Sequence, residues 1–288
     1  MDECSNNECR APVPLNVRLC PTCGHDVGYP NVRYATQPAE RAALDERYRA
    51  ARDAAAKRGA NATFSGFEEA VRTRSRAVIT VGADLLWSLF ESDTPLYANY
   101  ERQVGAALRL PAAPEHDHDR CIVAGALFGS FAPEISYAAL SLDGKGLTSY
   151  GRRSNRTALC TIVLGDFAIR SRASLLEENS FSFVTRHRLS VGIPIPAGYR
   201  ATWEDRHLLA VAKLADRLNP GTAEARFSGL LLSTEGDRET DEFVEVYIYG
   251  PFNRRAIDDI IEQVPGRTES ERIDIDRARD TLAALRKT

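Results

Sequence analysis

The chain contains 288 residues, of which 43% are hydrophobic and 27% charged, a composition typical of a folded globular protein and not of a disordered one. Its formal net charge of −3 at pH 7 argues against broad electrostatic attraction to nucleic acid or to anionic membranes. No apolar run approaches the ~20 residues that a membrane-spanning helix needs, and residues 1–4 lack the basic and apolar character that begins a secretion signal. We therefore expect a cytoplasmic protein without membrane contact.

The cysteines are unevenly distributed, because four of the six stand at the start of the chain. This grouping is typical of a metal site and not of a disulfide framework. They form two pairs, Cys4-x4-Cys9 and Cys20-x2-Cys23. Thiolates bind zinc tetrahedrally, and the short second spacing lets one tight turn supply two ligands. The wider first pair makes His25 an alternative ligand. We predict a zinc ribbon over residues 1–33, in which structural zinc holds together a segment too small to fold by burial alone.

Residues 34–120 are predicted to form a helical region. Helices are predicted over residues 37–58, 65–71, 84–90 and 96–110. These segments contain few helix-breaking residues or carry apolar residues at helical spacing. Residues 76–81 either continue the second helix or turn into a strand. Residues 111–119 are predicted to form a loop. Its run His116-Asp117-His118-Asp119 is interpreted as solvated and not as a second metal site, because consecutive loop residues seldom converge on one ion.

Residues 121–288 alternate strand and helix patterns and are predicted to form an α+β domain with a mixed, bent β-sheet. Period-two patterns and β-branched runs predict strands over residues 135–142, 157–164, 181–184, 227–233 and 242–249. Apolar stripes at helical spacing predict helices over residues 202–218, 255–264 and 270–287, the last with Ile273 facing inward. Cys121 and Cys160 are interpreted as small buried side chains, because neither has a neighbouring histidine that would activate a nucleophile.

The predicted strand over residues 242–249 carries a carboxylate among aromatic rings. Because side chains alternate along a strand, they divide into two sets that face opposite ways: Val244, Val246 and Ile248, and Phe243, Glu245, Tyr247 and Tyr249. Two interpretations of Glu245 remain open. Either the carboxylate is partly desolvated and suited to chemistry, or it lies at a sheet edge in water.

Three short segments of this region stand in an order that carries a family resemblance. They are Ser149-Tyr150-Gly151 ahead of the strand Thr161-Ile162-Val163-Leu164, Arg172-Ala173-Ser174 followed by Glu178-Asn179-Ser180, and Val244-Glu245-Val246-Tyr247-Ile248-Tyr249-Gly250-Pro251. Together they resemble the ADP-ribosyltransferase-like domains of phage head-associated proteins and bacterial toxins. Such domains have a Tyr-Gly strand, an Arg-Ala-Ser/Thr segment and a Glu-x-Gln or Glu-x-Glu strand before a glycine. The resemblance covers residues 135–261.

The resemblance implies a split, strongly bent sheet that clamps NAD in a cleft. Glu245 would be the catalytic carboxylate, which hydrogen-bonds the nicotinamide ribose and stabilises the oxocarbenium-like transition state as nicotinamide leaves. The resemblance also implies roles for other residues. Ser174 or Ser180 would support the glutamate, and Tyr150 would stack on the nicotinamide. Arg76 or Arg153 would hold the cofactor phosphates.

Tyr247 departs from the family pattern, which often has Gln or Glu at this position to orient the acceptor. ADP-ribosyl transfer, simple NAD hydrolysis and a fold without catalytic activity therefore all remain open. The first hypothesis is an NAD-consuming enzyme, such as a toxin or phage-conflict protein, whose zinc ribbon docks a macromolecular target. The second is a non-enzymatic adaptor whose ribbon binds a protein or nucleic acid. The sequence does not indicate the oligomeric state.

Overall fold

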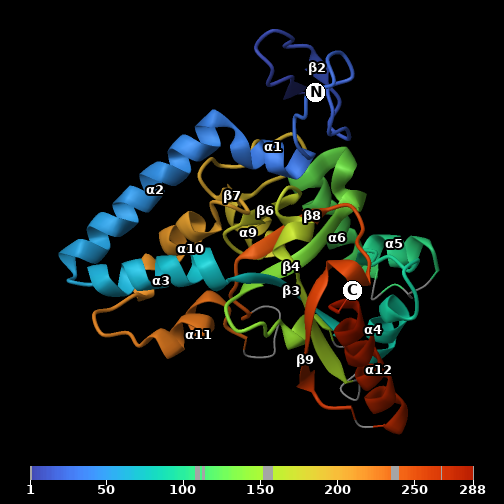
Figure 1. Cartoon of the computed structure of the whole chain (residues 1–288). Coiled ribbons are helices and arrows are strands. Elements are labelled where there is room, and N and C mark those ends of the chain that lie inside the picture. The colour runs from blue at the N-terminus through green and yellow to red at the C-terminus, as the bar shows by residue number, and fades with distance from the viewer. Residues whose placement is uncertain are drawn as a thin grey trace.

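The N-terminal ribbon stands at one end of a body in which helices surround a β-sheet (Figure 1). The computed structural model describes residues 2–107, 111, 114–151, 158–234, 240–266 and 268–287. The ribbon contains two short paired strands, β1 (Asp2–Glu3) and β2 (Pro12–Val13). The body belongs to the α+β class that the sequence predicts.

The sheet of the body has seven strands within the described residues, and every neighbouring pair is antiparallel. Their spatial order is β7 (Arg200–Thr202), β6 (Ala173–Leu176), β8 (Glu245–Tyr249), β4 (Ile135–Ser141), β3 (Arg76–Gly82), β5 (Leu159–Leu164) and β9 (Ile257–Val264). The sheet is thus not mixed as expected, because a period-two pattern identifies a strand but not the direction of its partner. The open choice at residues 76–81 is resolved as a strand.

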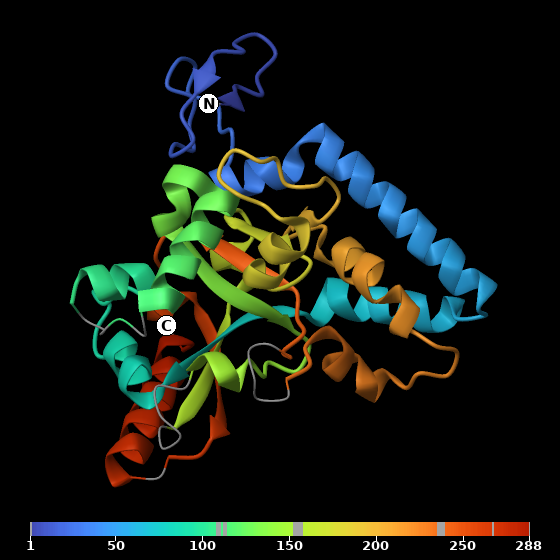
Figure 2. The same ribbon diagram turned by 180° about the vertical axis from the view of Figure 1, so that it is seen from behind.

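Helices precede, separate and follow these strands. They are α1 (Pro30–Thr36), α2 (Pro38–Lys57), α3 (Asn61–Arg74), α4 (Ala83–Phe90), α5 (Tyr100–Gly105), α6 (Pro114–Phe128), α7 (Thr148–Gly151), α8 (Asp166–Ile169), α9 (Ser180–His187), α10 (Arg206–Leu214), α11 (Phe227–Leu231) and α12 (Glu269–Leu285). Short 3₁₀ turns lie between some of them. Gly59, with a φ of +72°, allows the sharp reversal from α2 into α3. Both helices project to the same side of the sheet in both ribbon views (Figures 1 and 2).

One face of the sheet is covered by the main hydrophobic core. Helices α2, α3, α4, α10 and α12 all contribute buried side chains to it. Strand β8 contributes Val246 and Ile248, and Val244, the residue just before the strand, also belongs to this core. The helices of residues 34–120 therefore share one core with the later strands. The predicted boundary between residues 120 and 121 falls inside α6.

The opposite face carries two smaller apolar clusters. In one, α6 and α9 pack against Leu176 and Tyr247 of the sheet. In the other, Leu147 and Leu232 pack near Val78 and Phe243. Glu245 belongs to this second face, as the alternation of side chains predicts, so each face of β8 has its own surroundings.

Several sequence predictions are confirmed. Helices α2, α4 and α12 occupy the segments 37–58, 84–90 and 270–287, and α10 lies within 202–218. Strands β4 and β5 lie within 135–142 and 157–164, and every residue of β5 is buried, as its apolar run predicts. Strand β8 lies within 242–249.

Three segments have the opposite secondary structure to the one predicted. Residues 181–184 are helical in α9, because the Asn179 side chain accepts hydrogen bonds from the amides of Phe181 and Ser182 and caps a helix there. Residues 227–231 form the short helix α11, whose two buried residues are one helical turn apart. Residues 257–264 form strand β9 and not a helix.

The error at β9 has a structural cause. Its pairing with β5 is interrupted by register shifts, one of them between Val163 and Leu164. The shift places both Ile257 and Ile260 in the core, three residues apart, which is the spacing of a helix face. An irregular edge strand therefore imitates a helix in sequence.

The segment between residues 96 and 121 also differs from its prediction. Among the described residues of the predicted helix 96–110, only Tyr100–Gly105 is helical. The helix begins there because Asn99 caps α5. Residues 108–110 lie outside the described part of the chain. The predicted loop 111–119 mostly belongs to α6, which begins at Pro114, a residue suited to a first helical turn. Cys121 is exposed on this helix and not buried, whereas Cys160 is buried as predicted. Ile273 of α12 is 41% exposed, and Ile275 faces the core instead.

Candidate functional site

Glu245 lies at the start of β8, in the interior of the sheet between β6 and β4. It pairs with Leu176 on one side and Ala139 on the other. Only 5% of the surface of Glu245 is exposed to solvent. This placement excludes the solvated sheet edge, which was one of the two interpretations that the sequence left open.

The Glu245 carboxylate is held by two hydrogen bonds to one oxygen. The backbone amide of Ser180 donates to Oε2 over 2.8 Å, and the Tyr247 hydroxyl donates to the same oxygen over 3.0 Å. Burial raises the pKa of Glu245 to about 7, although both donors oppose the rise by stabilising the anion. A carboxyl group with this pKa can exist in either charge state near neutral pH, as an acid, base or electrostatic catalyst requires.

The N-terminus of α9 provides the first of these donors. The Asn179 side chain accepts from the amides of Phe181 and Ser182, and the preceding amide, that of Ser180, donates to Glu245. The Asn179 side-chain nitrogen also donates to the Tyr150 hydroxyl over 2.7 Å. The Tyr150 ring in turn meets Phe243 edge to face, with 5.9 Å between ring centroids. One capping residue thus links the carboxylate to an aromatic pair.

Glu245 faces a cavity of about 910 Å³. The cavity lies on the second face of the sheet, and α5, α6, α9 and the segment around α7 contribute to its walls. Its polar and aromatic lining includes Thr80, Tyr97, Asn99, Tyr100, Glu101, Asp119, Arg120, Tyr137, Tyr150, Asn179, Ser180, Phe181, Arg186, Phe243 and Glu245. Its volume suits a ligand of nucleotide size, and its mixture of rings and a few charged groups is typical of small-molecule sites.

Two arginines line the cavity beside the carboxylates of Asp84, Glu101, Asp119 and Glu245. Arg120 of α6 lies over the Tyr100 ring, 4.3 Å from its centroid, and its charge lowers the pKa of Glu245. Arg186 of α9 forms ion pairs with Glu177 and Glu178 at the side of the cavity. Both could attract the phosphates of a ligand.

The structure brings together only some of the residues that the resemblance selects. Tyr150, Ser180 and Glu245 line one cavity. Ser174 shares the sheet face of Glu245 but stands opposite Tyr247, and its hydroxyl accepts from Asn31 over 3.1 Å. Arg76 does not line the cavity, and its guanidinium donates to the Ser75 carbonyl. Arg153 lies outside the described residues.

Several cavity residues were missed by the sequence analysis, namely Glu101, Arg120, Tyr137 and Asn179. Glu101 and Arg120 stand on helices that meet the sheet only through tertiary packing, so no local pattern marks them. Asn179 carried a usable signal, because an asparagine before Ser-Phe-Ser-Phe is a good helix N-cap.

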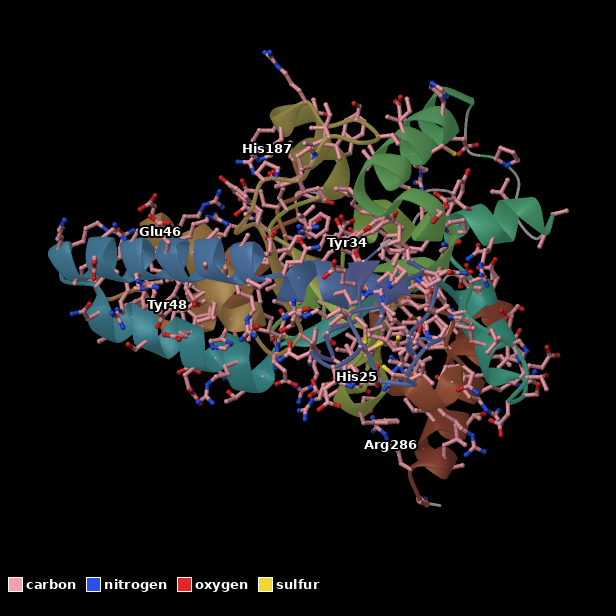
Figure 3. All side chains as sticks on the ribbon, turned by 90° about the horizontal axis from the view of Figure 1, so that it is seen from above. His25, Tyr34, Glu46, Tyr48, His187 and Arg286 are labelled. Carbon is pink, nitrogen blue, oxygen red and sulfur yellow. The ribbon has the colours of Figure 1, made fainter. Side chains whose placement is uncertain are left out.

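The ribbon contains a second candidate site. The sulfur atoms of Cys4, Cys9, Cys20 and Cys23 all lie within 4.8 Å of one another, an arrangement compatible with a metal site. The amides of Cys23 and Thr22 lower the pKa of the Cys20 thiol to about 6, whereas burial raises the pKa of Cys4 to about 12. His25, the alternative ligand, is exposed and is not one of this group. Figure 3 shows the yellow sulfur atoms beside His25 in a view down onto the ribbon.

The ribbon rests on the body through a small set of contacts. The buried Arg33 guanidinium donates to the carbonyls of Pro14, Leu15 and Val17. The Tyr29 ring lies 5.1 Å from that of Tyr249, at the opposite end of β8 from Glu245. The two candidate sites are therefore joined by one strand but share no residue.

Comparison with protein-family models and with curated proteins found no match to this chain. In the described part of the chain, no helix combines the length and apolar character needed to cross a bilayer.

Proposed function

We propose that the protein cleaves the bond between nicotinamide and ribose in NAD, and passes the ADP-ribose to a macromolecular target or to water. The observation that carries this proposal is the buried Glu245 carboxylate, aimed from the centre of the sheet into a cavity of nucleotide size. The resemblance of three sequence segments to ADP-ribosyltransferase-like domains supports it, since Tyr150, Ser180 and Glu245 come from those segments.

In this proposal Glu245 acts as an anion beside developing positive charge. As the carbon–nitrogen bond breaks, its electron pair leaves with nicotinamide and the ribose ring becomes oxocarbenium-like. A carboxylate in a partly dry site stabilises that charge more strongly than water does. The amide of Ser180 and the hydroxyl of Tyr247 fix its orientation in advance. The Tyr150 and Phe243 rings offer an aromatic wall for nicotinamide, and Arg120 and Arg186 offer charge for the phosphates.

We further propose that the cysteine cluster holds a structural zinc ion. Zinc–sulfur bonds of about 2.3 Å in a tetrahedron place neighbouring sulfur atoms about 3.8 Å apart. The sulfur atoms of Cys4 and Cys23 are 3.7 Å apart, and those of Cys9 and Cys20 are 3.8 Å apart. Four thiolates fill the coordination sphere, so this ion would stabilise the ribbon and take no part in the chemistry.

The test is nicotinamide release from NAD by the purified protein, with and without cell lysate as a source of acceptors. Wild type should release nicotinamide, and Glu245→Gln should reduce the rate by at least about 100-fold, within the range for loss of a key electrostatic group. Glu91→Gln, at an exposed position beyond α4, is the matched control and should behave as wild type. No release by wild type in either condition would refute the proposal.

A non-enzymatic adaptor is the second candidate function. It is favoured by the position of the ribbon at the end of the body (Figure 1). It is also favoured by Leu19, an apolar side chain that is 55% exposed. Its neighbours both make contacts within the ribbon, Arg18 with Asp26 and Cys20 in the cysteine cluster. If NAD is not cleaved, a protein or nucleic-acid partner retained by wild type and lost with Leu19→Ser would establish this alternative.

A further inference from the structure

The proposed reaction needs a second group that the sequence analysis did not find. Glu245 stabilises positive charge on the ribose, but an acceptor hydroxyl or a water molecule must also lose a proton as it attacks. Tyr247 cannot receive that proton, because its hydroxyl donates to Glu245 and its side chain does not line the cavity. The base must therefore come from another wall of the cavity.

Glu101 stands on that wall in a fixed position. It occupies the first turn of α5, two residues after the N-cap Asn99. The Asn99 side chain is buried and donates to the carbonyls of Ile135 and Pro133 over 2.8 and 3.0 Å, which ties the start of α5 to the start of β4. The Arg102 guanidinium adds an ion pair with Glu134. Glu101 is thus carried by an anchored helix end and not by a free loop.

The surroundings of Glu101 suit a carboxylate that exchanges a proton. Burial raises the pKa of Glu101, and the charge of Arg120 opposes the rise. Tyr137 lies within electrostatic reach of both carboxylates, because the charges of Glu245 and Glu101 both add to the rise that burial causes in its pKa. Asp84, Asp119 and Tyr100 line the same cavity. Among the four carboxylates that face this cavity in the described part of the chain, Glu245 comes from β8 and Glu101 from α5.

We propose that Glu101 is the catalytic base of this site, the group that accepts the proton of the incoming acceptor. This inference rests on the proposed function. In the step, the acceptor oxygen forms a bond to the anomeric carbon and its proton moves to a Glu101 carboxylate oxygen. The bond from that carbon to nicotinamide breaks, and its electron pair leaves with neutral nicotinamide. Glu245 remains an anion throughout, and Glu101 later releases the proton to water.

Chemical rescue tests this assignment. Glu101→Gln should lower kcat for nicotinamide release by about 100-fold or more while KM for NAD changes less than about threefold, since a general base contributes 10²–10⁴-fold. Azide needs no base, because it attacks without losing a proton. Sodium azide should restore release by Glu101→Gln and yield an ADP-ribosyl azide, but should not rescue Glu245→Gln. Glu91→Gln should match wild type with and without azide.

The outcomes separate the two proposals. If the wild-type protein releases no nicotinamide, both the NAD activity and the role of Glu101 are overturned. An active wild type with an unimpaired Glu101→Gln overturns the role of Glu101 alone. A variant that folds, binds NAD and is slow but gains nothing from azide also overturns it, because the side chain would then hold the site in shape without taking the proton.

Discussion

The two faces of strand β8 differ in what they bury. Val246 and Ile248 enter the main core, which joins helices from both halves of the chain. Glu245 and Tyr247 lie on the opposite face, where a carboxylate and a hydroxyl satisfy each other beside a cavity. Both faces are buried, yet burial stabilises the apolar side chains of the first, whereas it costs free energy for the Glu245 carboxylate on the second.

This contrast shows how one strand can serve stability and chemistry together. The apolar face holds β8 in place through Val244, Val246 and Ile248, which do not line the cavity that Glu245 faces. The polar face accepts a carboxylate whose burial raises its pKa to about 7. Truncating Ile248 on the apolar face and neutralising Glu245 on the polar face should therefore move stability in opposite directions.

The largest expected effect comes from the apolar face. Ile248→Ala should lower the free energy of unfolding by about 2–5 kcal/mol, because it leaves a cavity among fully buried neighbours. Ile122→Ala, at a 44% exposed position on α6, is the control and should change stability by less than about 0.5 kcal/mol. Urea unfolding measures both. Equal effects would mean that the core face is not what holds β8.

Glu245→Gln should have the opposite effect. The folded-state pKa of about 7 lies above the ordinary value of 4.5, so the folded protein disfavours the ionised carboxylate. The cost of ionising Glu245 in the folded protein lowers the free energy of unfolding. This cost is absent below pH 4.5, grows between pH 4.5 and 7, and is complete above pH 7. It then reaches up to about 3 kcal/mol, at 1.36 kcal/mol per pKa unit. The variant should therefore be more stable than wild type at pH 8 and equal to it near pH 4. A variant less stable at pH 8 would contradict the buried charge.

Tyr247→Phe sharpens the account of the polar face. Removing the hydroxyl deletes one of the two hydrogen bonds to the carboxylate, so the pKa of Glu245 should rise further, by roughly one unit for a bond to a charged group. The expected loss of stability at pH 8 is about 1–2 kcal/mol, and at pH 4 it should be smaller. NMR titration of a labelled glutamate carboxyl would measure the pKa. An unchanged titration would mean that Tyr247 does not hold Glu245.

Metal removal should affect the sheet least. If the cluster holds zinc as proposed, a chelator should unfold the ribbon, because its four cysteines then lose the ion that they share. The body should lose only about 1 kcal/mol, the order of one aromatic contact such as that between Tyr29 and Tyr249. Hydrogen exchange should accelerate at the amide of Cys20, which donates to His25, and stay slow in β8. Fast exchange in β8 would show that the ribbon supports the sheet.

Local patterns predicted the parts of this molecule that depend on neighbouring residues. Alternation along residues 243–249 predicted both faces of β8, and cysteine spacing predicted the cluster that the ribbon forms. Alternation is a signal between adjacent residues, and each cysteine pair is separated by only four or two residues. These signals say where a side chain points, but not which other segment it meets.

The remaining features depend on partners that are distant in the chain. Glu101 and Arg120 line the cavity that Glu245 faces only because α5 and α6 pack on the second face of the sheet. The burial of Glu245 depends on β6 and β4 as neighbours of β8, and no local pattern states strand order. Ser174 lies two pairs along the ladder from Glu245, opposite Tyr247, because a local pattern does not state the register between two strands.

The most direct test of the account is the pH dependence of nicotinamide release by wild type and Glu245→Gln. If Glu245 acts as an anion with a pKa of about 7, the rate should rise tenfold per pH unit below pH 7 and level off above it, and the variant should lack this activity. A wild-type rate that is constant between pH 5 and 9, or a variant as active as wild type, would contradict the central role of Glu245.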